Sequence, residues 1–204
     1  MQKNYEKKDE RILVVKRDRL FANGAWHGIH VGDTQKYVSL IDGAGEFQWR
    51  SAMETDTQYK QIIPYLVFAY EDKIFIMQRR SDSSEQRLRN KMSIGIGGHM
   101  RQEDMQEKDI FAWARREFHE EVAYNGSFKI ETIGIVNDDT NDVGKVHIGL
   151  VLLLRGDSSE ISVKSELKHG QMLSLSECEQ YYDQMEGWSQ LVFDSLRTKL
   201  QSKS

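Results

Sequence analysis

Three glutamates at helical spacing are the residues of this sequence best suited to carry chemistry. Glu117, Glu120 and Glu121 stand at positions i, i+3 and i+4 of one uninterrupted run. On an α-helix this spacing puts all three carboxylates on one face, where like charges repel and weaken the helix. A bound cation would relieve that repulsion, and oxygen-only ligands favour Mg²⁺ or Mn²⁺ over zinc. The alternative interpretation is an ordinary solvated acidic face.

Neighbouring residues favour the metal-binding interpretation. Arg116 precedes Glu120 by four residues, the spacing of an intrahelical ion pair, so its guanidinium can orient a carboxylate. Gly97 and Gly98 come earlier in the chain, and a double glycine lets backbone groups approach a metal ion or a phosphate closely.

The element that must position the glutamates is the helix predicted for residues 109–122. This stretch lacks glycine and proline, and apolar side chains recur every four residues along it, at Ile110, Ala114, Phe118 and Val122. Around it the sequence predicts strands at 11–15, 65–70, 73–79, 92–96, 129–136, 146–154 and 171–173, a helical turn at 16–21 and a helical tail at 176–200. Strands interleaved with two long helices indicate a layered α/β or α+β domain.

The chain is interpreted as two parts. Residues 1–60 are expected to form an accessory segment packed on the core, and residues 61–204 to form the main domain. The accessory segment contains His27 and His30, but two histidines three residues apart without a third ligand favour ordinary packing over a metal site.

Composition excludes several classes of protein. The 204 residues include 28 Lys and Arg against 32 Asp and Glu, a net charge of −4, which gives no drive toward a nucleic-acid polymer. The single cysteine, Cys178, excludes an internal disulfide and a cysteine-rich zinc site. The single cysteine favours a reducing, cytoplasmic location, and because no apolar run is long enough to cross a bilayer, we expect no membrane partner.

Residues 116–124, REFHEEVAY, resemble the catalytic half of the sequence signature of the Nudix hydrolases. Two departures from the signature are visible: Ala123 stands where the family has glycine, and Gly98 lies four residues farther from Arg116 than the pattern prescribes. Glu103 and Glu107 therefore compete for the first glutamate of the signature. We interpret the difference as a longer loop ahead of the helix.

The resemblance covers residues 61–204. The stretches YKQIIPYLVFAY, SIGIGGH, NDDTNDVGKVHIGL and WSQLVFDSL are similar to a subgroup of bacterial Nudix proteins usually labelled phosphoesterases. The resemblance implies a Nudix-type α/β/α sandwich with a mixed β-sheet. It also makes a homodimer an expected assembly.

The activity implied by the resemblance is metal-dependent hydrolysis of a pyrophosphate bond in a nucleoside diphosphate linked to a group X, or in another small phosphorylated substrate. The implied metal ligands, for Mg²⁺ or Mn²⁺, are Glu117, Glu120, Glu121 and the Gly98 carbonyl. The general base is either one of these glutamates or Glu166, which matches the commonest position outside the signature. The remaining implied roles are substrate binding by Arg79, Arg80, Gly97 and His99, and orientation of a carboxylate by Arg116.

The alternative is a catalytically weak Nudix-fold module that binds nucleotides or regulates. The altered signature motivates it, whereas the three retained glutamates favour the enzyme. Selectivity is expected from the loops 81–90 and 137–145, while His147 and Trp188 are interpreted as packing residues.

Overall fold

The computed structural model describes residues 9–79, 90–105, 109–164 and 167–201. Ten strands within these ranges form one mixed sheet. Its central path runs β12 (Leu167–Ser174), β5 (Lys73–Arg79), β4 (Tyr59–Tyr70), β10 (His147–Gly156), β9 (Phe128–Asn137) and β2 (Gly28–His30). Strands β4 and β10 are parallel, and the other neighbours on this path are antiparallel.

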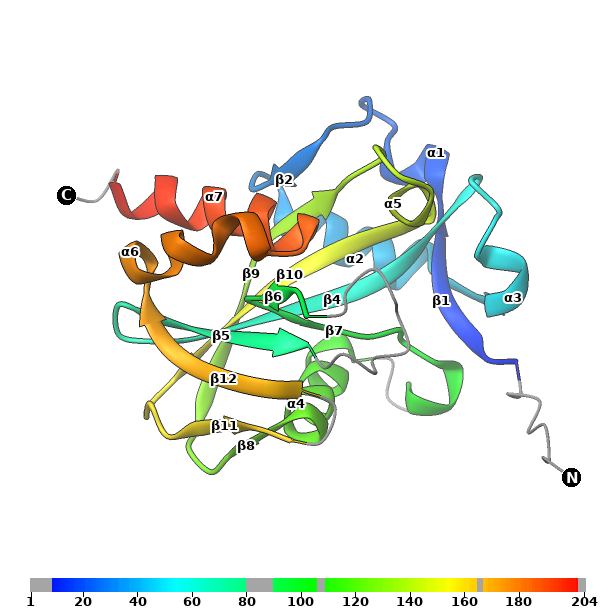
Figure 1. Ribbon diagram of the computed structural model, residues 1–204. Coiled ribbons are helices and arrows are strands. Elements are labelled where there is room, and N and C mark those ends of the chain that lie inside the picture. Colours follow the sequence, from blue (N-terminus) through cyan, green and yellow to red (C-terminus); the bar gives the residue numbers. More distant parts are fainter. Residues whose placement is uncertain (1–8, 80–89, 106–108, 165–166, 202–204) are drawn as a thin grey trace, which may run out of the picture.

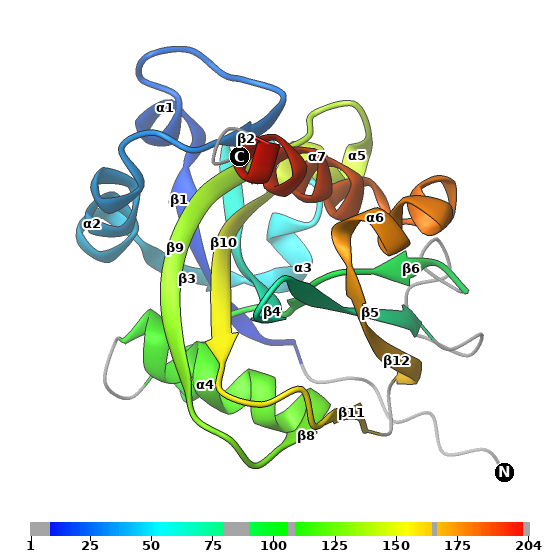
Figure 2. The ribbon, with the colours of Figure 1, turned by 90° about the vertical axis from the view of Figure 1, so that its left-hand side faces the viewer.

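Helices cover both faces of the sheet. Leu66 and Phe68 of β4 belong to one apolar core together with Phe118 of α4 (Ile110–Glu121). The alternate residues Tyr65 and Val67 belong to a second core with α7 (Gly187–Gln201). Because successive side chains of a strand point to opposite faces, the continuous apolar run of β4 requires a covering layer on each side. Figures 1 and 2 show α7 above the sheet and α4 below it, which confirms the expected sandwich.

The first sixty residues contribute strands to the same sheet. Strand β1 (Arg11–Lys16) pairs with β4 and with β3 (Glu46–Trp49), and β2 pairs with β9. Three helices connect these strands: α1 (Arg17–Leu20), α2 (Thr34–Ala44) and α3 (Arg50–Met53). Apolar residues of β1, α1 and α2 join the core that contains α4.

Strand β4 begins six residues earlier than the sequence predicts, so Pro64 lies inside the strand. Residues 59–61 of β4 pair with β1, and residues 65–66 pair with β7 (Ile96–Gly97), so Pro64 lies between the two paired parts. The missing amide hydrogen of Pro64 therefore leaves no gap in either of these ladders.

Several other expected elements are divided. The strand expected at 92–96 is split into β6 (Met92–Ser93) and β7. The short helix α5 (Asp142–Val146) occupies the second half of the loop expected at 137–145 and the first residue of the strand expected at 146–154. The helical tail consists of α6 (Leu175–Cys178), η3 (Glu179–Gln184) and α7. The remaining elements are η2 (Gln102–Asp104) and a two-stranded ribbon of β8 (Val122–Tyr124) and β11 (Ile161–Val163). No helix within the described ranges is long and apolar enough to span a membrane.

Candidate active site

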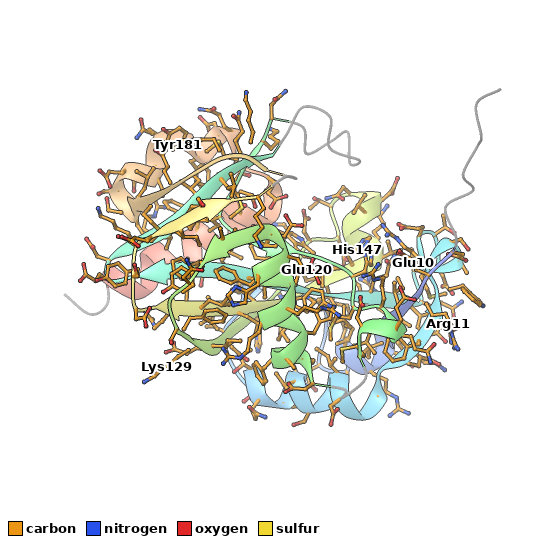
Figure 3. The ribbon with its side chains drawn as sticks, turned by 90° about the horizontal axis from the view of Figure 1, so that it is seen from below. Glu10, Arg11, Glu120, Lys129, His147 and Tyr181 are labelled. Carbon is orange, nitrogen blue, oxygen red and sulfur yellow. The ribbon has the colours of Figure 1, made fainter. Side chains whose placement is uncertain are left out.

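Helix α4 holds the three glutamates as their spacing predicts. The side chain of Asp109 caps its start by accepting a hydrogen bond from the amide of Phe111, at 2.8 Å. Buried residues such as Trp113 and Phe118 fix one side of the helix against the sheet, which turns the acidic side away from the core. Figure 3 shows Glu120 on this helix, in front of the sheet when the molecule is seen from below.

Glu117 lies directly against Gly98. A Cβ atom on Gly98 would collide with Oε1 of Glu117, so only glycine lets the carboxylate approach the backbone here. Burial, and then the charges of Glu120 and Glu121, raise the pKa of Glu117 to about 7. The carboxylate face and the double glycine, about twenty residues apart in sequence, are thus brought together.

Arg116 lies beside Glu120, with 3.3 Å between Nε and Oε1. Its Nη1 atom is also 3.1 Å from Oδ1 of Asp104, a partner that the sequence analysis missed. Asp104 is held in turn by Arg101, whose Nε donates a 2.7 Å hydrogen bond. The side chain of Glu103 is 74% exposed and pairs with Arg101, at 3.8 Å, so the structure shows it facing solvent.

The donor set of α4 fits a hard divalent cation. The described residues contain no ready-made group of three Asp, Glu, His or Cys side chains around one point. Nevertheless, Glu117 is half-buried near two other carboxylates whose charges disfavour its ionised form, and a bound cation would relieve that repulsion. Carboxylate and carbonyl oxygens are the ligands that Mg²⁺ and Mn²⁺ prefer.

A cavity of about 150 Å³ opens beside the double glycine. Its walls are formed by residues 97–99, by the segment 138–147 and by residues 186–188, together with Ile63 and Tyr65 of β4. The cavity and Glu117 therefore share Gly98 as a common boundary.

Two histidines form part of this wall. Nε2 of His99 lies 2.7 Å from Oε1 of Gln61 and 3.2 Å from Nε2 of His147. The Gln61 amide nitrogen donates to the carbonyl of Met53, so its oxygen accepts from His99. Nδ1 of His147 donates to the carbonyl of Val143, at 2.7 Å. His147, which is labelled in Figure 3, is buried, as expected, but it also lines the cavity.

Another part of the cavity wall contains a network around Glu186. Its carboxylate accepts hydrogen bonds from Tyr65, at 3.1 Å, and from Ser93, at 2.6 Å, while Tyr65 also contacts Ser189 at 2.7 Å. Burial raises the pKa of the Tyr65 phenol well above its usual value, so this hydroxyl stays neutral. Trp188, interpreted from sequence as a packing residue, lines the cavity beside this network.

Asp138 and Glu186 are candidate site residues that sequence reasoning did not single out. Asp138 is 8% exposed and accepts hydrogen bonds from the amide and hydroxyl of Thr140 and from the side chain of Asn141. Its position after a buried strand was a usable signal, and the loop 137–145 was indeed expected to line the pocket. No local signal marks Glu186, because two of its partners, Tyr65 and Ser93, come from distant segments.

Some of the expected site residues fall outside the part of the chain that the structure describes. Arg80, Glu107 and Glu166 lie outside the described residues, and Arg79 ends β5 with its side chain outside the described part. Of the loop expected at 81–90, only Asn90 is described.

Comparisons with known proteins extend over nearly the whole chain. No protein-family model matches it. It is 36% identical over 206 residues to Protein YmaB of Bacillus subtilis strain 168, covering 93% of this chain and 98% of that protein. The crystal structure of Tm1382, a candidate Nudix hydrolase, superposes with a TM-score of 0.78 at 32% identity, covering 92% of this chain and 98% of the other.

A more distant structure shares the fold. The Nudix domain of Shewanella oneidensis NrtR, complexed with ADP-ribose, has a TM-score of 0.54 at 14% identity and covers 69% of this chain and 88% of that one. The chain belongs to the Nudix hydrolase superfamily, and the protein is an enzyme of the Nudix hydrolase class. The resemblance read from residues 116–124 is thereby confirmed.

Proposed function

We propose that this enzyme uses Mg²⁺ or Mn²⁺ to hydrolyse the pyrophosphate bond of a nucleoside diphosphate linked to a group X, or of another small phosphorylated compound. The observation that carries the proposal is the acidic face of α4, with Glu117 packed against Gly98 at the edge of a cavity. Glu117, Glu120, Glu121 and the Gly98 carbonyl would hold the metal. A bound divalent cation offsets the charge of a pyrophosphate and lowers the pKa of a coordinated water.

The chain's own residues have three tasks in this reaction. Arg116 holds the carboxylate of Glu120 in place through their ion pair. The cavity on the far side of Gly98 receives the part of the substrate beyond the diphosphate. A carboxylate takes the proton of the attacking water, and we propose a glutamate of α4 or Glu166 for this role. A new P–O bond forms, the bridging P–O bond breaks, and two phosphorylated products leave.

A substrate panel with a matched variant tests the proposal. The panel holds nucleoside diphosphate sugars, dinucleoside polyphosphates, nucleoside triphosphates and ADP-ribose, the last because a Nudix domain of this fold binds it. We expect metal-dependent release of products by the wild type, loss of release by Glu120→Gln, and no change in Glu131→Gln. Glu131 is a fair control because it is half exposed and pairs with Arg155.

Two results would contradict this assignment. Equal turnover by wild type and Glu120→Gln would remove Glu120 from the reaction. Tight nucleotide binding without any product would favour the alternative of a binding or regulatory module. The expected homodimer is tested separately by light scattering at several concentrations, where a strictly monomeric mass would refute it.

The substitution Gly98→Ala is expected to lower metal-dependent hydrolysis by about 100-fold or more, because the new methyl group displaces the carboxylate of Glu117. Gly43→Ala is the matched control. A Cβ on Gly43, inside α2, meets nothing within 4 Å, so this variant keeps full activity and gains about 0.5–1 kcal/mol of stability. Steady-state assays and urea unfolding measure both effects, and full activity in Gly98→Ala would show that the close approach is dispensable.

A further inference from the structure

Two cations hold the segment that forms one wall of the cavity. Lys60 of β4 is fully buried, and its Nζ atom donates to Oδ1 of Asp139 at 2.6 Å, to the carbonyl of Gly144 at 2.6 Å and to the carbonyl of His147 at 3.1 Å. These three hydrogen bonds use all three hydrogens of the ammonium group. Lys60 thereby ties together both ends of the segment 139–147.

The second cation comes from the N-terminal segment. Both terminal nitrogens of Arg17, in α1, donate to the carboxylate of Asp139, and Nη1 also donates to the carbonyl of Lys145 at 3.2 Å. The ring of Phe21 lies 4.9 Å from the guanidinium carbon and keeps the arginine in place. Together, Arg17 and Lys60 fix the wall segment at four residues: 139, 144, 145 and 147.

The inner side of this segment lines the cavity. Asp138, Asn141, Val143, Gly144 and His147 all face it. The segment is tightly folded, because a Cβ on Gly144 would collide with the carbonyl of Asp138. A shift of the anchored carbonyls would therefore move the cavity wall itself.

The N-terminal segment also contacts the start of the wall. The carbonyl of Trp26 accepts a 2.6 Å hydrogen bond from the side chain of Asn137, and Nδ1 of His27 lies 3.5 Å from Oδ1 of Asp138. Residues before position 60 thus contact this wall at 137, 138, 139 and 145. Arg17 itself is not among the described residues that line the cavity.

We propose that Arg17 and Lys60 are positioning residues for substrate binding: through Asp139 they hold the cavity wall in the shape that accepts the part of the substrate beyond the diphosphate. This inference rests on the proposed function. None of the three glutamates of α4 is among the described residues that line the cavity, so loss of Arg17 acts on affinity rather than on the chemical step.

The test compares Arg17→Gln with Arg50→Gln. Both arginines belong to the N-terminal segment, with side chains 30% and 31% exposed, but Arg50 pairs with Glu10 and Glu54 and makes no contact with the wall among the interactions of the described residues. We expect Arg17→Gln to raise KM about tenfold, the equivalent of a lost charge-assisted hydrogen bond, with kcat within about twofold of wild type. Arg17→Lys should recover part of the affinity, and Arg50→Gln should change neither constant.

Hydrogen exchange without substrate provides the second readout. We expect faster exchange of the amides of residues 138–147 in Arg17→Gln only. Unchanged exchange there would overturn the inference whether or not the protein hydrolyses diphosphates. An unchanged KM, or equal effects in Arg50→Gln, would also overturn it, because a general loss of stability would then explain the result. The protein could also prove to hydrolyse none of the compounds. In that case, faster exchange in Arg17→Gln together with weaker binding of ADP-ribose, measured by calorimetry, would support the inference and refute only the hydrolytic activity.

Discussion

The Glu117→Gln variant is expected to lose metal-dependent hydrolysis by about 100-fold or more, yet to unfold at a higher temperature than the wild type when metal is removed. Glu117 is half-buried near Glu120 and Glu121, and both its partial burial and this proximity disfavour its negative charge. Glutamine has nearly the same shape and carries no charge. The substitution therefore removes a repulsion together with a metal ligand.

Thermal unfolding at pH 8, with EDTA and with Mn²⁺, measures the gain in stability without metal and the loss of metal binding. Mn²⁺ should stabilise the wild type, because a ligand that binds only the folded state shifts the unfolding equilibrium. It should stabilise Glu117→Gln much less. Glu131→Gln, with its partner Arg155 on the sheet surface, should behave as wild type in both buffers. A variant that is less stable in EDTA, or that responds fully to Mn²⁺, would show that Glu117 has a structural role.

The Asp139→Asn variant is expected to lose about 3 kcal/mol of stability, because it leaves Lys60 buried without its charged partner. Burial alone would raise the pKa of Asp139, but hydrogen bonds from Arg17 and Lys60 outweigh it and lower that pKa to about 2. Since the folded-state pKa lies below the ordinary aspartate value of 3.8, the stabilisation is complete above pH 3.8 and is lost as the pH falls toward 2.

Urea unfolding at pH 7 and at pH 3 tests this prediction. The difference between wild type and Asp139→Asn should be largest at pH 7 and should shrink at pH 3. In a Lys60→Met background the cost of Asp139→Asn should fall by about 1 kcal/mol or more, since no buried ammonium is then left unpaired. Strict additivity of the two substitutions, or an equal difference at both pH values, would contradict the proposed coupling.

The parts of the fold that were predictable depend on local patterns. The helix at Ile110–Glu121 follows from its four-residue apolar repeat, and the strands β5, β9 and β10 follow from apolar runs between turn residues. The helix α2, in the N-terminal segment, has a weaker apolar repeat than α4 and was not predicted. The helical tail was predicted as one element, because its interruption at Met185 and Glu186 depends on contacts with Met92 and Ser93.

The sequence by itself determined the acidic face, Arg116 beside Glu120 and the family, because helical spacing is a local property that 3.6 residues per turn fix without reference to the rest of the chain. Only the tertiary structure decided that Glu117 lies against Gly98, and that Asp138, Glu186 and Trp188 share one cavity. Such contacts join residues far apart in sequence, as Tyr65 and Ser189 are, 124 positions apart. They depend on how the strands pair and how the helices pack on them, which no local pattern records.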